Sequence, residues 1–79
     1  MMVTVLFFGA TAALAGKRSI EIPISEHTKG EEILRQILDR YPKIAEHRLL
    51  FSVNQQYATG KEVLHEGDEL AIFTAVSGG

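Results

Sequence analysis

The chain has 79 residues, 46% of them hydrophobic, with eight basic and ten acidic side chains and a formal net charge of −2. This length fits one small domain, and the hydrophobic share is rich enough for a core, which argues against intrinsic disorder. The charge balance argues against nucleic-acid binding, because neutralising phosphates takes a concentrated basic surface. The absence of cysteine excludes disulfides, cysteine-ligated zinc and a thiol nucleophile, and fits a reducing compartment.

The first predicted strand covers residues 3–8, which are rich in β-branched and aromatic side chains and end at Gly9. The apolar run around it has no basic flank and is too short to span a bilayer, so we expect a cytoplasmic protein with no membrane partner. Residues 10–15 are rich in alanine and predict a helical turn. Residues 19–24 carry isoleucine at every second position, which predicts a strand with one buried face, and Pro23 indicates a sheet edge or a strand end.

The central segment predicts one amphipathic helix. Thr28 and Glu31 have the spacing of a capping box, in which two side chains satisfy free backbone N–H groups at a helix start, and Pro42 ends the pattern. Apolar side chains follow between these signals at helical spacing: Ile33, Leu34, Ile37, Leu38 and Tyr41. This stripe has to pack on something, and a sheet is the only large partner available.

The second half predicts a connector at 42–48 with a short helical turn, a strand at 49–53, a turn at 54–56, a brief strand at 57–58, a tight turn at 66–68 and a last strand at 69–76. With a single main helix, this order predicts an α+β fold of the β-grasp (ubiquitin-like) type: a mixed sheet of four to five strands with one main helix packed on one face. We find no repeat, low-complexity run or linker. A single domain over residues 1–79 is expected, with a flexible C-terminal tail from about residue 75.

Strand parity predicts which side chains leave the sheet on its open side. Glu69 and Phe73 share one face of the last strand, and Leu70 and Ile72 share the other. The charged Glu69 marks its face as the solvent side, so Phe73 is expected to be exposed, and the same reasoning places Phe8 outward on the first strand. Two such phenylalanines on neighbouring strands would form an apolar patch of the kind that marks a partner's footprint, unless a loop or the tail covers them.

Residues that commonly carry catalysis or hold metals are scattered. His27, His47 and His65 share no metal-binding spacing and are interpreted as surface histidines. No serine lies in a nucleophile elbow, and no glycine-rich phosphate loop is present. A solvated hairpin edge, or alternatively a docking patch for a basic partner, explains an acidic cluster formed by Glu62, Glu66, Asp68 and Glu69. The domain is therefore expected to be non-catalytic alone, with no cofactor or metal of its own.

The final Gly78-Gly79 is the strongest functional signal. Two glycines also fit a frayed end, but here they follow directly on an apolar strand that runs to Val76. An end without side chains can thread a narrow channel and bring its carboxylate to a buried reactive centre. That carboxylate is unreactive until it is activated with ATP as an acyl-adenylate. The chain has no nucleotide-binding motif, so the ATP would be used in trans by a partner enzyme.

Several stretches of the sequence, in this order and spacing, resemble the small subunit of molybdopterin synthase, a ubiquitin-like sulfur carrier. They span nearly the whole chain: VLFFG at 5–9, ALAG at 13–16, SVNQ at 52–55, GDELAI at 67–72 and VSGG at 76–79. In one departure, Thr74-Ala75 stand where that family usually carries two prolines, which would stiffen the tail and block strand pairing.

The resemblance implies a chemical cycle at Gly79. A ubiquitin-activating-like adenylyltransferase adenylates it, a sulfur donor enzyme converts it to a thiocarboxylate, and the tail inserts into the large synthase subunit with Gly78 as spacer. There the sulfur passes to cyclic pyranopterin monophosphate for molybdenum cofactor biosynthesis, within a heterotetramer. The expected contacts to the partner are Phe8, Phe73, Val76 and Ser77.

Three other functions stay open at this point. A sulfur carrier of another pathway, such as that of thiamine thiazole, shares the fold, although that family is typically shorter and lacks the stretch at 13–16. A ubiquitin-like protein modifier conjugated through Gly79 to target lysines needs the same activated tail. A plain binding module would use only the patch around Phe8 and Phe73.

Overall fold

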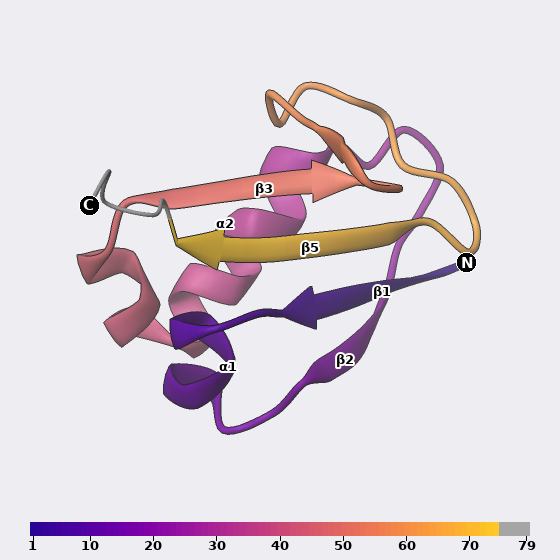
Figure 1. The fold of residues 1–79 in the computed structure, drawn as a ribbon. Coiled ribbons are helices and arrows are strands. Elements are labelled where there is room, and N and C mark those ends of the chain that lie inside the picture. Colours follow the sequence, from indigo (N-terminus) through magenta and orange to yellow (C-terminus); the bar gives the residue numbers. More distant parts are fainter. Residues whose placement is uncertain (75–79) are drawn as a thin grey trace.

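The computed structural model of the protein describes residues 1–74, which form a mixed five-stranded sheet with one main helix behind it (Figure 1). The strands are β1 (Met2–Phe7), β2 (Ser19–Pro23), β3 (Leu49–Val53), β4 (Gln56–Tyr57) and β5 (Glu69–Thr74). The helices are α1 (Ala10–Ala15), α2 (Gly30–Arg40) and the 3-10 helix η1 (Pro42–Glu46). The strand order is β2-β1-β5-β3-β4, with β1 and β5 parallel and the other neighbours antiparallel. This confirms the predicted β-grasp fold.

The core lies between the sheet and α2. Val3, Val5 and Phe7 alternate along β1 and are each at most 3% exposed, and they face Ile33 and Ile37 of α2, which are at most 1% exposed. Burying an apolar side chain of this size stabilises the fold by about 1.5–3 kcal/mol. The parity of β1 and the stripe of the helix were therefore predicted correctly, and together they assign one face of the sheet to the core.

The start of α2 differs from the prediction. The capping box expected between Thr28 and Glu31 is wrong, since the helix begins at Gly30 with Lys29 as its N-cap residue. The backbone N–H of Lys29 donates to Oε2 of Glu32 over 2.7 Å. The reach-back from a glutamate is therefore present, one residue further along the chain than the sequence pattern indicates.

A distant loop explains this shift. The N–H of Gly30 donates to the carbonyl of Glu62 over 2.9 Å, and the N–H of Glu31 donates to the carbonyl of Gly60 over 2.7 Å. Free N–H groups in a first helical turn need such partners. The loop around residues 60–62 supplies them through the backbone, and this long-range contact sets the point at which the helix begins.

The remaining elements follow the sequence closely. Pro23 is the last residue of the edge strand β2, and the connector contains η1, as expected. The brief strand β4 starts one residue earlier than predicted because Asn54 and Gln55, both at positive φ (50° and 70°), form a two-residue turn. Within residues 1–74, no helix is long and apolar enough to cross a membrane.

Candidate functional site

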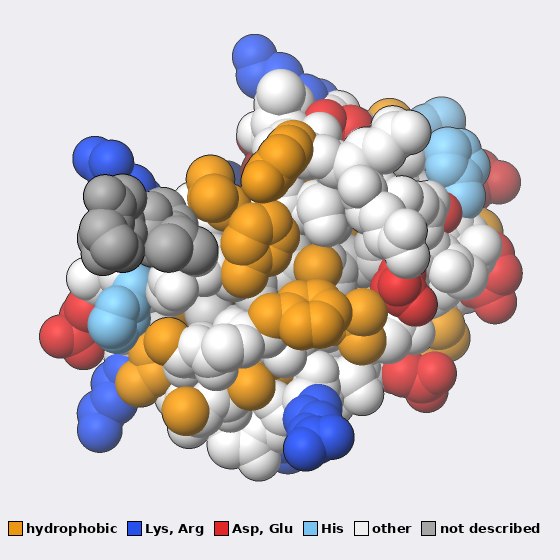
Figure 2. Space-filling view, viewed as in Figure 1, with side chains coloured by type: hydrophobic (Ala, Val, Ile, Leu, Met, Phe, Trp, Pro, Cys, Tyr) orange, Lys and Arg blue, Asp and Glu red, His pale blue; other side chains and the backbone are white. Residues whose placement is uncertain are grey.

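The face of the sheet opposite α2 carries a cluster of apolar side chains at the end where β1 and β5 finish. The β1–β5 ladder ends with Phe7 beside Ile72, and the N–H of Phe8 donates to the carbonyl of Ile72 over 3.1 Å. The residues that follow these two, Phe8 and Phe73, therefore lie on adjacent segments of the backbone and on the outer face of the sheet. On β3, Leu50 is paired with Phe73. Figure 2 shows hydrophobic side chains gathered across the middle of this face.

We call this surface the outer patch; its residues are Leu6, Phe8, Leu50, Tyr57, Ala71 and Phe73. Phe8 is 51% exposed, Leu50 37% and Tyr57 78%. An exposed apolar surface of this kind is typical of a site that a partner covers. The predicted outward position of Phe8 is confirmed, and the described residues leave it open to solvent.

Phe73 is only half-buried rather than fully exposed. Its ring lies 6.1 Å from the ring of Tyr57, with the two planes tilted by 49°. Tyr57 is brought there by the hairpin that joins β3 to β4, and the sequence pattern did not predict it as a site residue. Leu50 was not predicted as a site residue either. Strand parity could have identified it, since its neighbour Phe51 points into the core and Leu50 must then point outward.

The outer patch borders the point at which the described chain ends. Thr74 is the last residue of β5 and is paired with Leu49. The predicted tail from residue 75 lies outside the described residues, and so do four predicted site residues: Val76, Ser77, Gly78 and Gly79. Their roles stay predictions. The structure therefore places Phe8 beside the end of β5, the strand that carries Phe73 and leads to the predicted tail.

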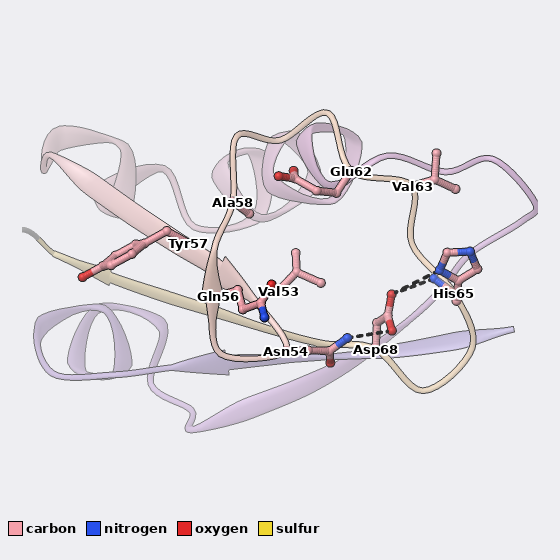
Figure 3. Close-up of a pocket in the computed structure, with 9 residues that line it drawn as sticks. All are labelled: Val53, Asn54, Gln56, Tyr57, Ala58, Glu62, Val63, His65 and Asp68. Atoms are coloured by element: carbon pink, nitrogen blue, oxygen red, sulfur yellow. Dashed lines mark hydrogen bonds and ion pairs between the residues drawn. The ribbon is translucent and has the colours of Figure 1, made fainter.

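A polar hollow of about 420 Å³ lies between the β3–β4 hairpin and the loop that precedes β5 (Figure 3). On its floor the Nδ2 group of Asn54 donates to Oδ1 of Asp68 over 3.0 Å. Oδ2 of Asp68 accepts the backbone N–H of His65 over 2.8 Å, and Nδ1 of His65 lies 3.8 Å away. These bonds close the turn before β5, so Asp68 acts here as a structural acceptor.

Glu62 has a similar structural role on the other side of the hollow. Its carboxylate accepts the N–H groups of Thr59 and Gly60, each over 2.8 Å. Hydrogen bonds from the backbone, with that of Thr59 foremost, hold the pKa of Glu62 below its ordinary value of 4.5. Among the described residues, no three His, Asp or Glu side chains converge into a metal-binding group, and all three histidines are exposed. The acidic cluster thus contains two carboxylates engaged in holding turns.

A β-grasp domain with an open apolar sheet face beside its C-terminal strand defines the chain as a ubiquitin-like protein. The family model described as the ThiS family matches residues 5–79. The chain belongs to this family.

Relatives agree with this assignment, and solved structures share the fold. The human molybdopterin synthase sulfur carrier subunit is 35% identical over 82 residues, covering 98% of this chain and 93% of that protein. SAMP1 from Haloferax volcanii has the same fold, with a TM-score of 0.87 at 22% identity over all of both chains. A structure of subunits 1 and 2 of the molybdopterin-converting factor from Helicobacter pylori contains a chain with a TM-score of 0.70 at 24% identity, covering both chains in full.

Proposed function

We propose that this chain is the sulfur carrier subunit of a molybdopterin synthase. The observation that carries the proposal is the similarity over 98% of the chain to proteins of that name, from human at 35% identity to Mycobacterium tuberculosis at 32%. A carrier needs a surface that a partner can hold while the terminus reacts. The outer patch, which adjoins the end of β5, supplies such a surface.

The chemistry takes place on the carboxylate of Gly79. A carboxylate oxygen attacks the α-phosphorus of ATP on an adenylyltransferase, pyrophosphate leaves, and an acyl-adenylate forms. Hydrosulfide supplied by a donor enzyme then attacks the carbonyl carbon, the new C–S bond replaces the C–O bond to AMP, AMP leaves, and loss of the sulfur's proton gives the thiocarboxylate. The role of this chain is to present its end, with Gly78 as spacer, because residues without side chains fit a narrow channel.

The thiocarboxylate then delivers its sulfur to cyclic pyranopterin monophosphate inside the large synthase subunit. The patch residues Phe8 and Phe73 would contact that subunit, followed along the chain by Val76 and Ser77. The Helicobacter pylori structure, which holds subunits 1 and 2 in one complex, supports a two-subunit assembly of this kind. We propose a heterotetramer of two small and two large subunits in the cytoplasm.

Intact-mass measurement tests the proposal directly. The chain is co-expressed with its adenylyltransferase and sulfur donor, and the purified protein is expected to carry one oxygen replaced by sulfur. The matched control omits the adenylyltransferase and should give the unmodified mass. An unmodified mass in both samples, together with adducts on target lysines, would contradict the carrier and identify a protein modifier.

A second measurement separates the pathways. The thiocarboxylated chain is incubated with the large synthase subunit and cyclic pyranopterin monophosphate, and formation of molybdopterin is followed. A carrier of the thiamine thiazole pathway would accept sulfur and give no molybdopterin in this assay. The names of the relatives favour the molybdopterin outcome.

A further inference from the structure

Thr11 is a fully buried polar side chain at the end of the sheet to which β1 and β5 run. It lies in α1, one residue after the helix begins, and its exposed fraction is 0%. Its hydroxyl oxygen lies 2.7 Å from the carbonyl oxygen of Phe8 and 2.8 Å from that of Ile72. It also accepts the N–H of Phe8 over 3.0 Å. One side chain therefore joins α1 to the ends of two strands.

These contacts take the place of the next rung of the sheet. The parallel ladder between β1 and β5 ends at Phe7 and Ile72, because the chain turns away into α1 after Phe8. Past that point Phe73 and Thr74 are paired with β3 on one side. On the other side, the hydroxyl of Thr11 holds the preceding carbonyl of β5. Figure 1 shows α1 next to the ends of the β1 and β5 arrows.

The backbone groups that Thr11 contacts have other partners. The N–H of Phe8 also donates to the carbonyl of Ile72 over 3.1 Å, and the carbonyl of Phe8 accepts the N–H of Thr11 itself over 3.2 Å. Removing the hydroxyl would therefore leave none of the three groups, the N–H and carbonyl of Phe8 and the carbonyl of Ile72, without a hydrogen bond, and the heavy penalty of an unsatisfied buried group would not arise. The hydroxyl therefore contributes mainly by fixing the orientation of these two backbone segments relative to each other.

We propose that Thr11 is a positioning residue, which holds Phe8 on the outer patch and fixes the backbone of β5 at Ile72, two residues before the last described residue. The inference rests on the proposed carrier function, since it concerns how the patch and the terminus are presented together. A partner that binds the outer patch and the terminus at the same time requires a defined distance and angle between them.

Substitution by valine tests the hydroxyl while keeping the shape of the side chain. T11V is compared with T11S, which retains the hydroxyl. It is also compared with T4V, which removes a threonine hydroxyl near the start of β1, away from Phe8 and Ile72. T11V is expected to fold and to bind the large subunit with a Kd raised roughly three- to tenfold, as expected for one lost hydrogen bond. Both T11S and T4V should stay within about twofold of the original chain.

Two further readouts separate positioning from stability. Sulfur transfer from thiocarboxylated T11V to substrate, at saturating large subunit, should be slower than for T11S. Hydrogen exchange at the Phe8 amide of the free chain should be roughly three- to tenfold faster in T11V. If the unsubstituted chain accepts no sulfur, the proposed function fails, and the exchange rate at Phe8 still tests the role of Thr11.

Three results would overturn the inference. T11V could bind and transfer sulfur like the unsubstituted chain, which would make the hydroxyl dispensable. T11S could be as impaired as T11V, which would assign the effect to the methyl group. T11V could unfold, which would make the hydroxyl a requirement of the fold itself.

Discussion

At the scale of single residues, the outer patch separates side chains that hold the fold from those that are free to bind. Phe73 is half-buried and its only described aromatic neighbour within residues 1–74 is Tyr57, whereas Ile72 beside it is 1% exposed and belongs to the core. A substitution at Phe73 is therefore expected to change the surface far more than the interior.

Phe73→Asp should weaken binding to the large subunit by at least about 30-fold, because the substitution removes a central apolar side chain and places a charge in the interface. The fold should survive, because the new carboxylate stays in contact with water. Val63→Asp is the matched control: Val63 is 41% exposed and lies on the loop before β5, outside the outer patch. Affinity is measured by calorimetry and folding by circular dichroism. Equal losses in both variants would show that the patch is not the binding surface. An unfolded Phe73→Asp chain would show that the parity argument is wrong and that Phe73 supports the fold.

At the scale of elements, the loop of residues 58–63 determines where α2 begins, because its carbonyl groups accept hydrogen bonds from the first turn of the helix. Gly60 has φ of +98°, and a Cβ atom placed there would lie 3.2 Å from Cβ of Glu31. Its carbonyl accepts the N–H of Glu31. Gly67 has φ of +83° and would meet no atom within 4 Å, which makes it a control for backbone strain alone.

Gly60→Ala should lower the free energy of unfolding by about 2–3 kcal/mol, because backbone strain is joined by displacement of the loop from the helix start. Gly67→Ala should cost about 1 kcal/mol from strain alone. Urea denaturation of both variants gives the comparison, with unchanged slopes indicating that the unfolded states are alike. Losses of the same size would mean that the contact with Glu31 carries no weight.

The same loop predicts a dependence of stability on pH. The pKa of Glu62 is lowered in the folded state, so the charged form stabilises the fold at pH values above the ordinary 4.5, and this stabilisation is lost as pH falls through the folded pKa. Glu62→Gln should melt at a lower temperature at neutral pH and show a smaller drop in Tm on acidification than the original chain. Melting curves between neutral and acidic pH test this, with Glu26→Gln, an exposed glutamate on the loop after β2, as a control. Parallel curves for Glu62→Gln and the original chain would contradict the prediction.

Local patterns predicted the faces of β1, β5 and α2 because alternation and helical spacing depend only on neighbouring residues. The predicted start of α2 was wrong by one residue because its hydrogen-bond partners, Gly60 and Glu62, lie about thirty positions away along the chain. A spacing rule cannot contain that information. The predicted box at Thr28 had the right chemistry, a glutamate that reaches back to a free N–H, at the wrong position.

The residues of the site also fall into two groups, those that local patterns predict and those that depend on distant contacts. Phe8 and Phe73 followed from parity, because the charged Glu69 marked the solvent side of the last strand and Phe8 continues the alternation of β1 by one residue. Tyr57 and Thr11 did not, because their roles depend on a hairpin and on the packing of α1 against the end of β5. Residues that join separate elements are visible only once the elements have been placed.

At the scale of the whole molecule, folding and sulfur transfer are assigned to different parts of the chain. The described core is built from residues between Val3 and Ile72. The proposed reactive group is the carboxylate of Gly79. A protein divided in this way should tolerate changes at its end without loss of stability, while its function should depend on that end completely.

Deletion of Gly79 is the sharpest test of this division. The free energy of unfolding should change by less than about 0.5 kcal/mol, as is usual for substitutions away from a core. Intact mass after co-expression with the adenylyltransferase and sulfur donor should show no thiocarboxylate, because the carboxylate that remains, on Gly78, lies one residue short of the reactive centre. Binding to the large subunit should persist through the outer patch, which makes the truncated chain a competitor of the full one in the synthase assay. A loss of stability above about 1 kcal/mol would give the terminus a structural role, and retained sulfur transfer would move the reactive group elsewhere.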